Sequence, residues 1–358
     1  MLEMVGTSII LSLCILSSLV SCNIAENDQI IKRHIQRGLF QCDEDVSLCP
    51  RKQMYGAQLI QLYPKWFVFQ SNRLEGALVY DDEEDDVRRG VFLYPDNISC
   101  IRGSWRKHLL VEGRYCEVEG VDENEDEELI IKTKDTSDKL LKYSPATFFS
   151  FGSDPVTEDP YESRTVTVKT SLIAGAGQGL FARRRISRGE LVSFYGGLVL
   201  TCRELQQFGS LIKSDDYNRE SIYQNSLQMP DIVLADDNSV SNTTINNNIK
   251  KRVSNMCVTV PPEMSGLESY RATLGHKANH HREKKNAEYG VFTSHPVLGT
   301  IMAVYATEDI DEGEEVFCNY GYEPVIAEVA VVETVVRVAM CRNYLFDFKF
   351  FILEYLSI

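Results

Sequence analysis

The hydrophobic pattern through residues 65–117 consists of short, strand-like apolar runs that alternate with turns containing Gly, Asp and Asn. Short apolar runs bounded by such residues are typical of strands connected by tight turns. The clearest apolar runs lie at 66–69, 77–80 and 91–94. The pattern predicts a series of antiparallel hairpins, within a β region that we place at residues 26–150.

A second strand-rich region follows a cluster of Pro and Gly residues near 145–160, which marks a domain boundary. Strand patterns return at 164–168 and 299–305, so we expect a second domain over residues 155–324. Residues 206–254 are polar and rich in Asn, and this composition predicts a long surface insertion in the second domain.

Both ends of the chain differ from its middle. Residues 5–22 are apolar and uncharged, and the small residues that end this run predict a secretory signal peptide within residues 1–25. Because no Lys or Arg precedes the run, an uncleaved membrane anchor and a wrong gene start stay open as alternatives. At the other end, residues 325–358 form an apolar tail whose spacing predicts a closing amphipathic helix.

The charge of the chain is strongly acidic. Its 358 residues include 52 Asp and Glu against 37 Lys and Arg, for a net charge of −15. Phosphate binding needs clustered cations, so we expect no direct nucleic-acid partner. An acidic surface attracts basic peptides, although acidity also serves solubility alone.

Ten cysteines are spread along the chain without a CxxC pair, so we expect no zinc finger and no metal site. Cys42 and Cys49 flank an acidic loop and could form a disulfide in a secreted chain. Two glycosylation acceptors, Asn97 and Asn242, also fit secretion. The compartment therefore stays open between the secretory pathway and the interior of the cell.

Three segments of the predicted second domain carry residues suited to chemistry. A Gly-rich turn at 175–181 follows a predicted strand, and its backbone N–H and C=O groups could cradle a ligand. Asn279 and His280 together supply donors and acceptors for a polar cofactor. Further on, Tyr320 and Tyr322 flank a Gly and can place two phenols in one pocket. The turn is not GxGxxG, and no Walker lysine or GxSxG is present, which argues against nucleotide folds and serine hydrolases.

In this order the three segments resemble the SET-domain protein-lysine methyltransferases. Asp-Pro-Tyr-Glu-Ser at 159–163, together with 193–196 and 275–280, is similar to the subgroup of histone-lysine methyltransferases that carries N-terminal MORN repeats. The resemblance is close over 159–200 and 272–322. It extends loosely to the predicted hairpins, which would then be MORN repeats.

The resemblance implies a mostly β protein, in which an antiparallel MORN-type sheet precedes a SET domain whose C-terminal strand forms a pseudoknot. It also implies S-adenosylmethionine as the methyl donor and no metal. Backbone contacts to this cofactor would come from Ala176, Gly177 and Gln178, and side-chain contacts from Asn279 and His280.

The resemblance also assigns the chemistry to tyrosines. Tyr320 would be the catalytic tyrosine, while Tyr195, Tyr289 and Tyr322 would line a channel for the substrate lysine. Asn225 is a further candidate for that channel. A channel crowded with tyrosines implies the transfer of one methyl group to a lysine of a histone or another protein.

Two departures from the family pattern leave a second hypothesis open. Residues 281–286 lack the subgroup's Phe-Thr-Pro-Asn sequence, and the tail lacks its Trp-containing closing helix. Together with the predicted leader, they support a non-catalytic and secreted SET-fold binding protein. The resemblance implies the nucleus or the cytoplasm instead, and we expect membrane attachment only if the leader is uncleaved.

Overall fold

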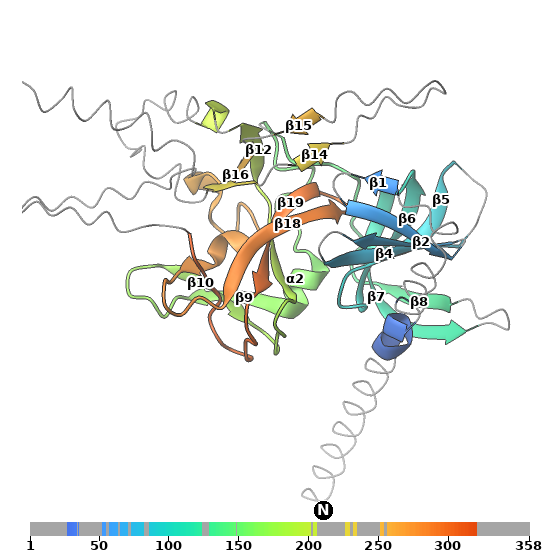
Figure 1. Cartoon of the computed structure of the whole chain (residues 1–358), viewed down its shortest axis with the longest axis horizontal. Coiled ribbons are helices and arrows are strands. Elements are labelled where there is room, and N and C mark those ends of the chain that lie inside the picture. Colours follow the sequence, from blue (N-terminus) through green and yellow to red (C-terminus); the bar gives the residue numbers. More distant parts are fainter. Residues whose placement is uncertain are drawn as a thin grey trace, which may run out of the picture. The chain divides into compact units, whose positions relative to one another are not determined.

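A computed structural model of the chain describes residues 27–33, 35, 52–54, 57–63, 65–70, 73–81, 86–123, 129–147, 149–201, 203–205, 226–229, 232–234, 251–253 and 256–320. Strands dominate these residues, so the predicted mostly β fold class is confirmed (Figure 1). The chain divides into two compact units. The first comprises Met1–Tyr143 with Thr293–Gly299, and the second comprises Ser144–Phe292 with Thr300–Ile358.

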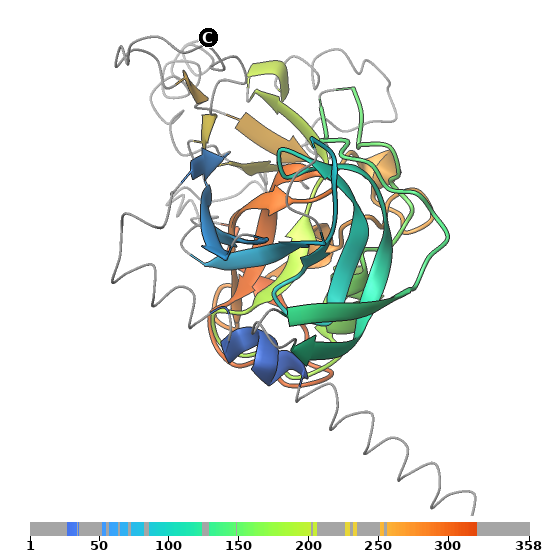
Figure 2. The ribbon, with the colours of Figure 1, turned by 90° about the vertical axis from the view of Figure 1, so that its right-hand side faces the viewer.

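Eight strands form one sheet in the first unit, and each strand pairs antiparallel with its neighbour in the sequence (Figure 2). Such a sheet is what a series of hairpins produces, as the apolar runs and the turns between them predict. The strands are Lys52–Met54 (β1), Ala57–Tyr63 (β2), Trp66–Gln70 (β3), Leu74–Tyr80 (β4), Arg88–Leu93 (β5), Ser99–Arg106 (β6), Leu109–Glu123 (β7) and Leu129–Asp135 (β8).

The sheet has buried residues on both faces. Trp66 and Val68 belong to a buried cluster on one face, on which the N-terminal helical residues pack through Ile31. Phe67 and Phe69 alternate with them and are buried as well. Successive residues of a strand point to opposite faces, so burial of both faces explains why the apolar runs are continuous. The described part of the chain contains no helix long and apolar enough to cross a membrane.

Three glycines lie side by side in neighbouring strands of this sheet. Gly90 on β5 faces Gly103 on β6, which in turn faces Gly113 on β7. A Cβ at Gly103 would lie 2.3 Å from the backbone oxygen of Glu112, so no larger residue fits without a shift. The buried Trp105 ring donates from Nε1 to the Gly90 carbonyl at 3.1 Å. The glycines are therefore required by close packing of backbone and ring.

A disulfide in this unit differs from the predicted one. Cys100 on β6 and Cys116 on β7 face each other with their Cα atoms 4.9 Å apart, and they are bonded and fully buried. Cys42, Cys49 and the predicted leader lie outside the described residues.

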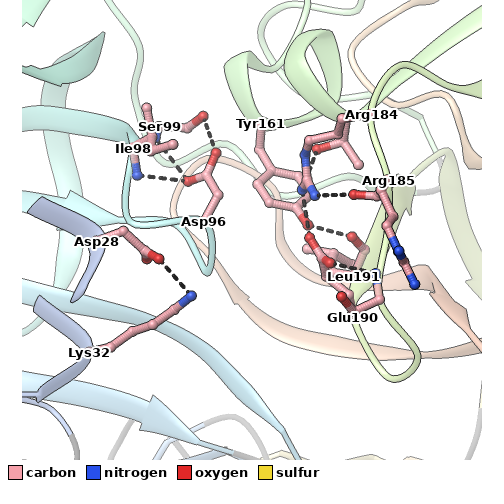
Figure 3. Close-up of polar contacts among 12 residues, drawn as sticks. Asp28, Lys32, Asp96, Ile98, Ser99, Tyr161, Arg184, Arg185, Glu190 and Leu191 are labelled. Atoms are coloured by element: carbon pink, nitrogen blue, oxygen red, sulfur yellow. Dashed lines mark hydrogen bonds and ion pairs between the residues drawn. The ribbon is translucent and has the colours of Figure 1, made fainter. Parts of the chain in front are cut away.

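The first glycosylation acceptor is not accessible in this fold. Asn97 is 2% exposed, and its side-chain amide donates to Asp28 Oδ1 at 3.0 Å. The neighbouring Asp96 carboxylate accepts from the backbone N–H of Ile98 and Ser99, which fixes the turn (Figure 3). Glycan attachment needs an exposed amide, so the folded chain does not present Asn97 for it.

The second unit consists of small sheets instead of one large sheet. A hairpin joins β9 to β10, and a five-stranded sheet has the order β11-β19-β18-β20-β17. β20 is the last described strand, yet it lies between two earlier strands and runs parallel to both. These elements are Pro160–Thr165 (α2), Val166–Thr170 (β9), Gln178–Ala182 (β10), Leu191–Tyr195 (β11), Gly275–Lys277 (η2), Asn279–His280 (β17), Ala287–His295 (β18), Gly299–Ala306 (β19) and Phe317–Cys318 (β20).

The predicted surface insertion contributes to the fold. One of its short strands pairs with β16 in a three-stranded sheet, and two others pair with each other. A polar and Asn-rich composition does not exclude such short strands, because their pairing depends on partners elsewhere in the chain. The strands are Leu198–Thr201 (β12), Ser226–Gln228 (β13), Ile232–Leu234 (β14), Lys251–Val253 (β15) and Met256–Thr259 (β16). Asn225, Asn242 and the C-terminal tail lie outside the described residues.

Candidate functional site

The Gly-rich turn joins β9 to β10. Gly175 and Gly177 have φ angles of 81° and 73°, a backbone conformation that glycine adopts without strain. Within the turn, Ser171 N–H donates to the Gly177 carbonyl at 2.8 Å. A Cβ at either glycine would meet nothing within 4 Å, so one side of the turn is open to a ligand.

The Asn-His pair forms β17, directly after the short helix η2. Asn279 Nδ2 donates to the Gln178 carbonyl at 3.0 Å, which attaches the pair to the start of β10. His280 Nδ1 accepts from the backbone N–H of Tyr320 at 3.0 Å. The predicted cofactor residues and the predicted catalytic tyrosine are thereby brought together.

Glu315 is a central residue of the site that the sequence analysis missed. Its buried carboxylate accepts from Ser171 Oγ at 2.6 Å, from Leu172 N–H at 2.7 Å and from Asn279 Nδ2 at 3.1 Å. A Cβ at Gly179 would lie 2.2 Å from Glu315 Oε1, so this glycine makes room for the carboxylate. Glu315 therefore fixes the Gly-rich turn against the Asn-His pair.

Lys277 provides a second connection between the same elements. Its ammonium group donates to Gln178 Oε1 at 2.7 Å and to the Ser265 carbonyl at 2.6 Å. Burial lowers the pKa of Lys277, although Glu268 opposes the shift. This side chain therefore crosslinks η2 to β10.

Three of the predicted tyrosines form a row, which we call the tyrosine row: Tyr195, Tyr289 and Tyr320. The ring centroids of Tyr195 and Tyr289 are 5.8 Å apart, and those of Tyr289 and Tyr320 are 6.1 Å apart. The Tyr320 hydroxyl donates to the Ala278 carbonyl at 2.5 Å, next to the Asn-His pair. Tyr322, the fourth predicted member, lies outside the described residues.

The surroundings of the tyrosine row keep its groups uncharged. Burial raises the pKa of Tyr289, and the neighbouring Tyr320, Cys318 and Tyr195 raise it further. Burial likewise raises the pKa of the Cys318 thiol to about 12. Beside the row, burial lowers the pKa of His276 to about 3, so its imidazole is neutral at pH 7. Neutral and partly desolvated walls disfavour a charged guest such as an ammonium ion.

The residues that surround the turn leave room for a polar cofactor. The open glycines leave space, while Asn279 and His280 place side-chain polar groups beside it. Among the described residues, no group of three or more His, Cys, Asp or Glu could hold a metal ion. The arrangement suits a cofactor bound by backbone and amide groups.

The class of protein is indicated by a family model. The model of the SET domain matches residues 177–321. This stretch begins in the Gly-rich turn and contains the Asn-His pair and Tyr320, whereas the eight-stranded sheet lies outside it. The candidate site is therefore part of a region similar to SET domains.

Individual relatives make the comparison more specific. The chain is 27% identical over 234 residues to a Halocynthia roretzi protein named histone-lysine N-methyltransferase SETD7. The alignment covers 65% of this chain and 51% of that protein, so the chain spans about half the length of this curated relative.

Two solved structures also match part of the chain. A Chaetomium thermophilum polycomb repressive complex 2, in an autoinhibited conformation bound to S-adenosylmethionine, is 19% identical with a TM-score of 0.28. That match covers 44% of this chain and 15% of the other. An active polycomb repressive complex 2 in the stimulated state is 20% identical with a TM-score of 0.30. That match covers 46% of this chain and 16% of the other.

Proposed function

We propose that the chain is an S-adenosylmethionine-dependent protein-lysine N-methyltransferase that adds one methyl group to a lysine of a histone or another protein. The observation that carries the proposal is the hydrogen bond from Tyr320 N–H to His280, which joins the predicted catalytic and cofactor residues. The match to the SET domain and the similarity to a histone-lysine methyltransferase support it. The MORN-repeat subgroup is part of this proposal, with the eight-stranded sheet as its repeat region.

The residues proposed to hold the cofactor are the Gly-rich turn and the Asn-His pair. Ala176, Gly177 and Gln178 would contribute backbone groups, while Asn279 and His280 would contribute side chains. When bound, S-adenosylmethionine supplies an electrophilic methyl group to an amine. The chain's own part is to orient the donor beside the tyrosine row, since alignment of the reacting atoms supplies much of the acceleration.

The tyrosine row is proposed to form the wall of the lysine channel. Its neutral surface favours the deprotonated amine over the ammonium ion, and only the deprotonated amine has a lone pair for the methyl group. The phenol oxygen of Tyr320 and nearby carbonyls can accept weak C–H···O contacts from a polarised methyl group. The edge-to-face contact of Tyr195 with Tyr289, whose ring centroids are 5.8 Å apart, would crowd the channel and favour the transfer of a single methyl group.

A second candidate function is favoured by one observation. The buried Cys100–Cys116 disulfide is typical of chains that fold in an oxidising compartment. It supports the alternative of a secreted, non-catalytic SET-fold binding protein, because histones and most of the methyl-donor pool are cytosolic and nuclear. The retention of Tyr320 beside His280 favours the enzyme.

Calorimetric titration of the purified chain with S-adenosylmethionine tests the proposal. We expect saturable binding that His280→Ala abolishes. His281→Ala, which removes the neighbouring half-buried ring beside Phe317, is the matched control and should retain binding. A folded wild-type chain that shows no binding would instead support the non-catalytic alternative. Where binding is found, transfer of a labelled methyl group to basic peptides identifies the substrate class, and mass spectrometry counts the methyl groups.

A further inference from the structure

A buried carboxyl group outside the tyrosine row connects two parts of the site. Glu162 lies in α2 and is 1% exposed. Its Oε1 atom accepts hydrogen bonds from the backbone N–H of Phe194 at 2.7 Å and of Leu274 at 3.0 Å, and from the Ser193 hydroxyl. A single oxygen atom thereby holds β11 and the segment that leads into η2.

Both attachments lie close to residues of the site. Phe194 directly precedes Tyr195, the first member of the tyrosine row. Leu274 directly precedes η2, after which come Asn279 and His280. A displacement of either N–H donor would therefore change the distance between the channel wall and the cofactor residues.

The helix that carries Glu162 is fixed at its start and along its length. Asp159 caps it, since its carboxylate accepts from the backbone N–H of Tyr161 at 2.9 Å. The buried Tyr161 hydroxyl donates to the Leu191 carbonyl on β11 (Figure 3). Beside it, Arg184 pairs with Glu190 at 2.6 Å. The carboxyl group of Glu162 is thus presented from a rigid element.

The charge state of Glu162 follows from its surroundings. Its second oxygen, Oε2, is buried and has no hydrogen-bond partner among the described residues. The titratable groups that face it are Asp159 on its own helix and the buried phenol of Tyr270, while β11 presents the Ser193 hydroxyl. Burial, followed by the charge of Asp159, raises the pKa of Glu162 to about 8, although the three hydrogen bonds to Oε1 oppose the shift. The carboxyl group is therefore protonated at neutral pH.

We propose that Glu162 is a positioning residue, which fixes the channel strand β11 and the cofactor segment at residues 274–280 in one arrangement. It acts in its uncharged form, in which Oε1 remains the common acceptor and Oε2 carries the proton. The binding test below rests on the proposed function, whereas the stability test does not.

The stability test compares wild type with Glu162→Gln, which preserves the acceptor and cannot ionise. The folded pKa of about 8 exceeds the usual 4.5, so the unfolded chain loses its proton first. Wild type therefore loses stability through Glu162 as pH rises from 4.5 to about 8, and the variant does not. We therefore expect the Tm of the variant, minus the Tm of wild type, to increase as pH rises over this range.

Glu158→Gln is the matched control for the stability test. Glu158 lies on the surface, where it pairs with Arg271, and its variant should differ from wild type by a constant amount. A Tm difference for Glu162→Gln that stays constant between pH 5 and pH 8 would overturn the proposal.

The binding test separates positioning from mere folding. We expect Glu162→Gln to bind S-adenosylmethionine within about 2-fold of wild type at pH 7, and Glu162→Ala to bind at least ~10-fold more weakly, because three donors lose their acceptor. An equal loss of S-adenosylmethionine affinity in Glu162→Gln and Glu162→Ala would contradict the proposal. If Glu162→Ala does not fold, Glu162→Gln and its Tm series over pH still test the proposal. If wild type binds no S-adenosylmethionine, the proposed function is wrong. The Tm series over pH then remains as the test of the role of Glu162.

Discussion

The eight-stranded sheet of the first unit and the candidate site of the second unit are assembled in different ways. In the sheet, every strand pairs with the strand before or after it in the sequence. In the site, Ser171 and Glu315 bond across 144 positions, and Asn279 and Gln178 across 101. The sheet is a local structure, whereas the site depends on segments that meet only after the domain has folded.

The difference shows where each unit is sensitive to substitution. A local sheet distributes its stability over many similar pairs, so the loss of one surface contact has a small effect. The site gathers its long-range contacts on a few acceptors, above all Glu315 and Glu162. Such acceptors are costly to remove, because a buried donor without a partner loses its hydrogen bond and regains no water.

The largest expected effect concerns the disulfide between β6 and β7. Replacing Cys100 and Cys116 together by Ala opens a loop with a sequence separation of 16. We expect a loss of about 3 kcal/mol in the free energy of unfolding, mainly because the unfolded chain gains freedom. Urea denaturation measures it, and S-adenosylmethionine affinity should be unchanged. A loss of affinity without a loss of stability would contradict this separation of the units.

The removal of Glu315 is the corresponding test in the second unit. Glu315→Ala leaves Ser171, Leu172 and Asn279 without their common acceptor. We expect S-adenosylmethionine affinity to fall about 30-fold, which corresponds to about 2 kcal/mol. Glu314→Ala is the matched control, because that neighbouring side chain is exposed and caps only the turn at Asp311. Similar affinities for the two variants would disprove the assigned role of Glu315.

The hairpins of the first unit could be predicted from the sequence because their information is local. The apolar runs at 66–69, 77–80 and 91–94 coincide with β3, β4 and the end of β5. The role of Glu315 could not be predicted, since nothing near it in the sequence indicates that Ser171 and Asn279 converge on it. The only signal was Gly179, whose missing side chain makes space for the carboxylate.

The site was partly predictable for a different reason. The Gly-rich turn, the Asn-His pair and Tyr320 are recognisable as a motif set, and the structure places them together. The Cys100–Cys116 bond was missed because β6 and β7 had to be paired in register before the two residues faced each other. Sequence spacing favoured Cys42 and Cys49 only through their proximity in the chain.

Tyr320→Phe separates the chemistry of the site from its assembly. The variant keeps the ring against His280 and Tyr289 but loses the hydroxyl that donates to Ala278. We expect kcat to fall at least ~10-fold with little change in cofactor affinity, because a positioned phenol is lost. Tyr305→Phe is the control, because it removes a hydroxyl on β19 that donates to the Val291 carbonyl on β18 at 3.3 Å. Unchanged turnover in Tyr320→Phe would remove its catalytic assignment.

The smallest expected effect is on the surface of the first sheet. Arg102 on β6 reaches both carboxylate oxygens of Asp135 at 2.9 and 3.0 Å, and both side chains are partly exposed. We expect Arg102→Ala to lower the free energy of unfolding by only about 0.5 kcal/mol, since solvent and salt screen exposed pairs. Urea denaturation at low and high salt checks this, and the difference should shrink as salt rises. A loss above about 2 kcal/mol would be too large for an exposed pair. It would mean that single surface contacts in the sheet matter as much as the buried acceptors of the site.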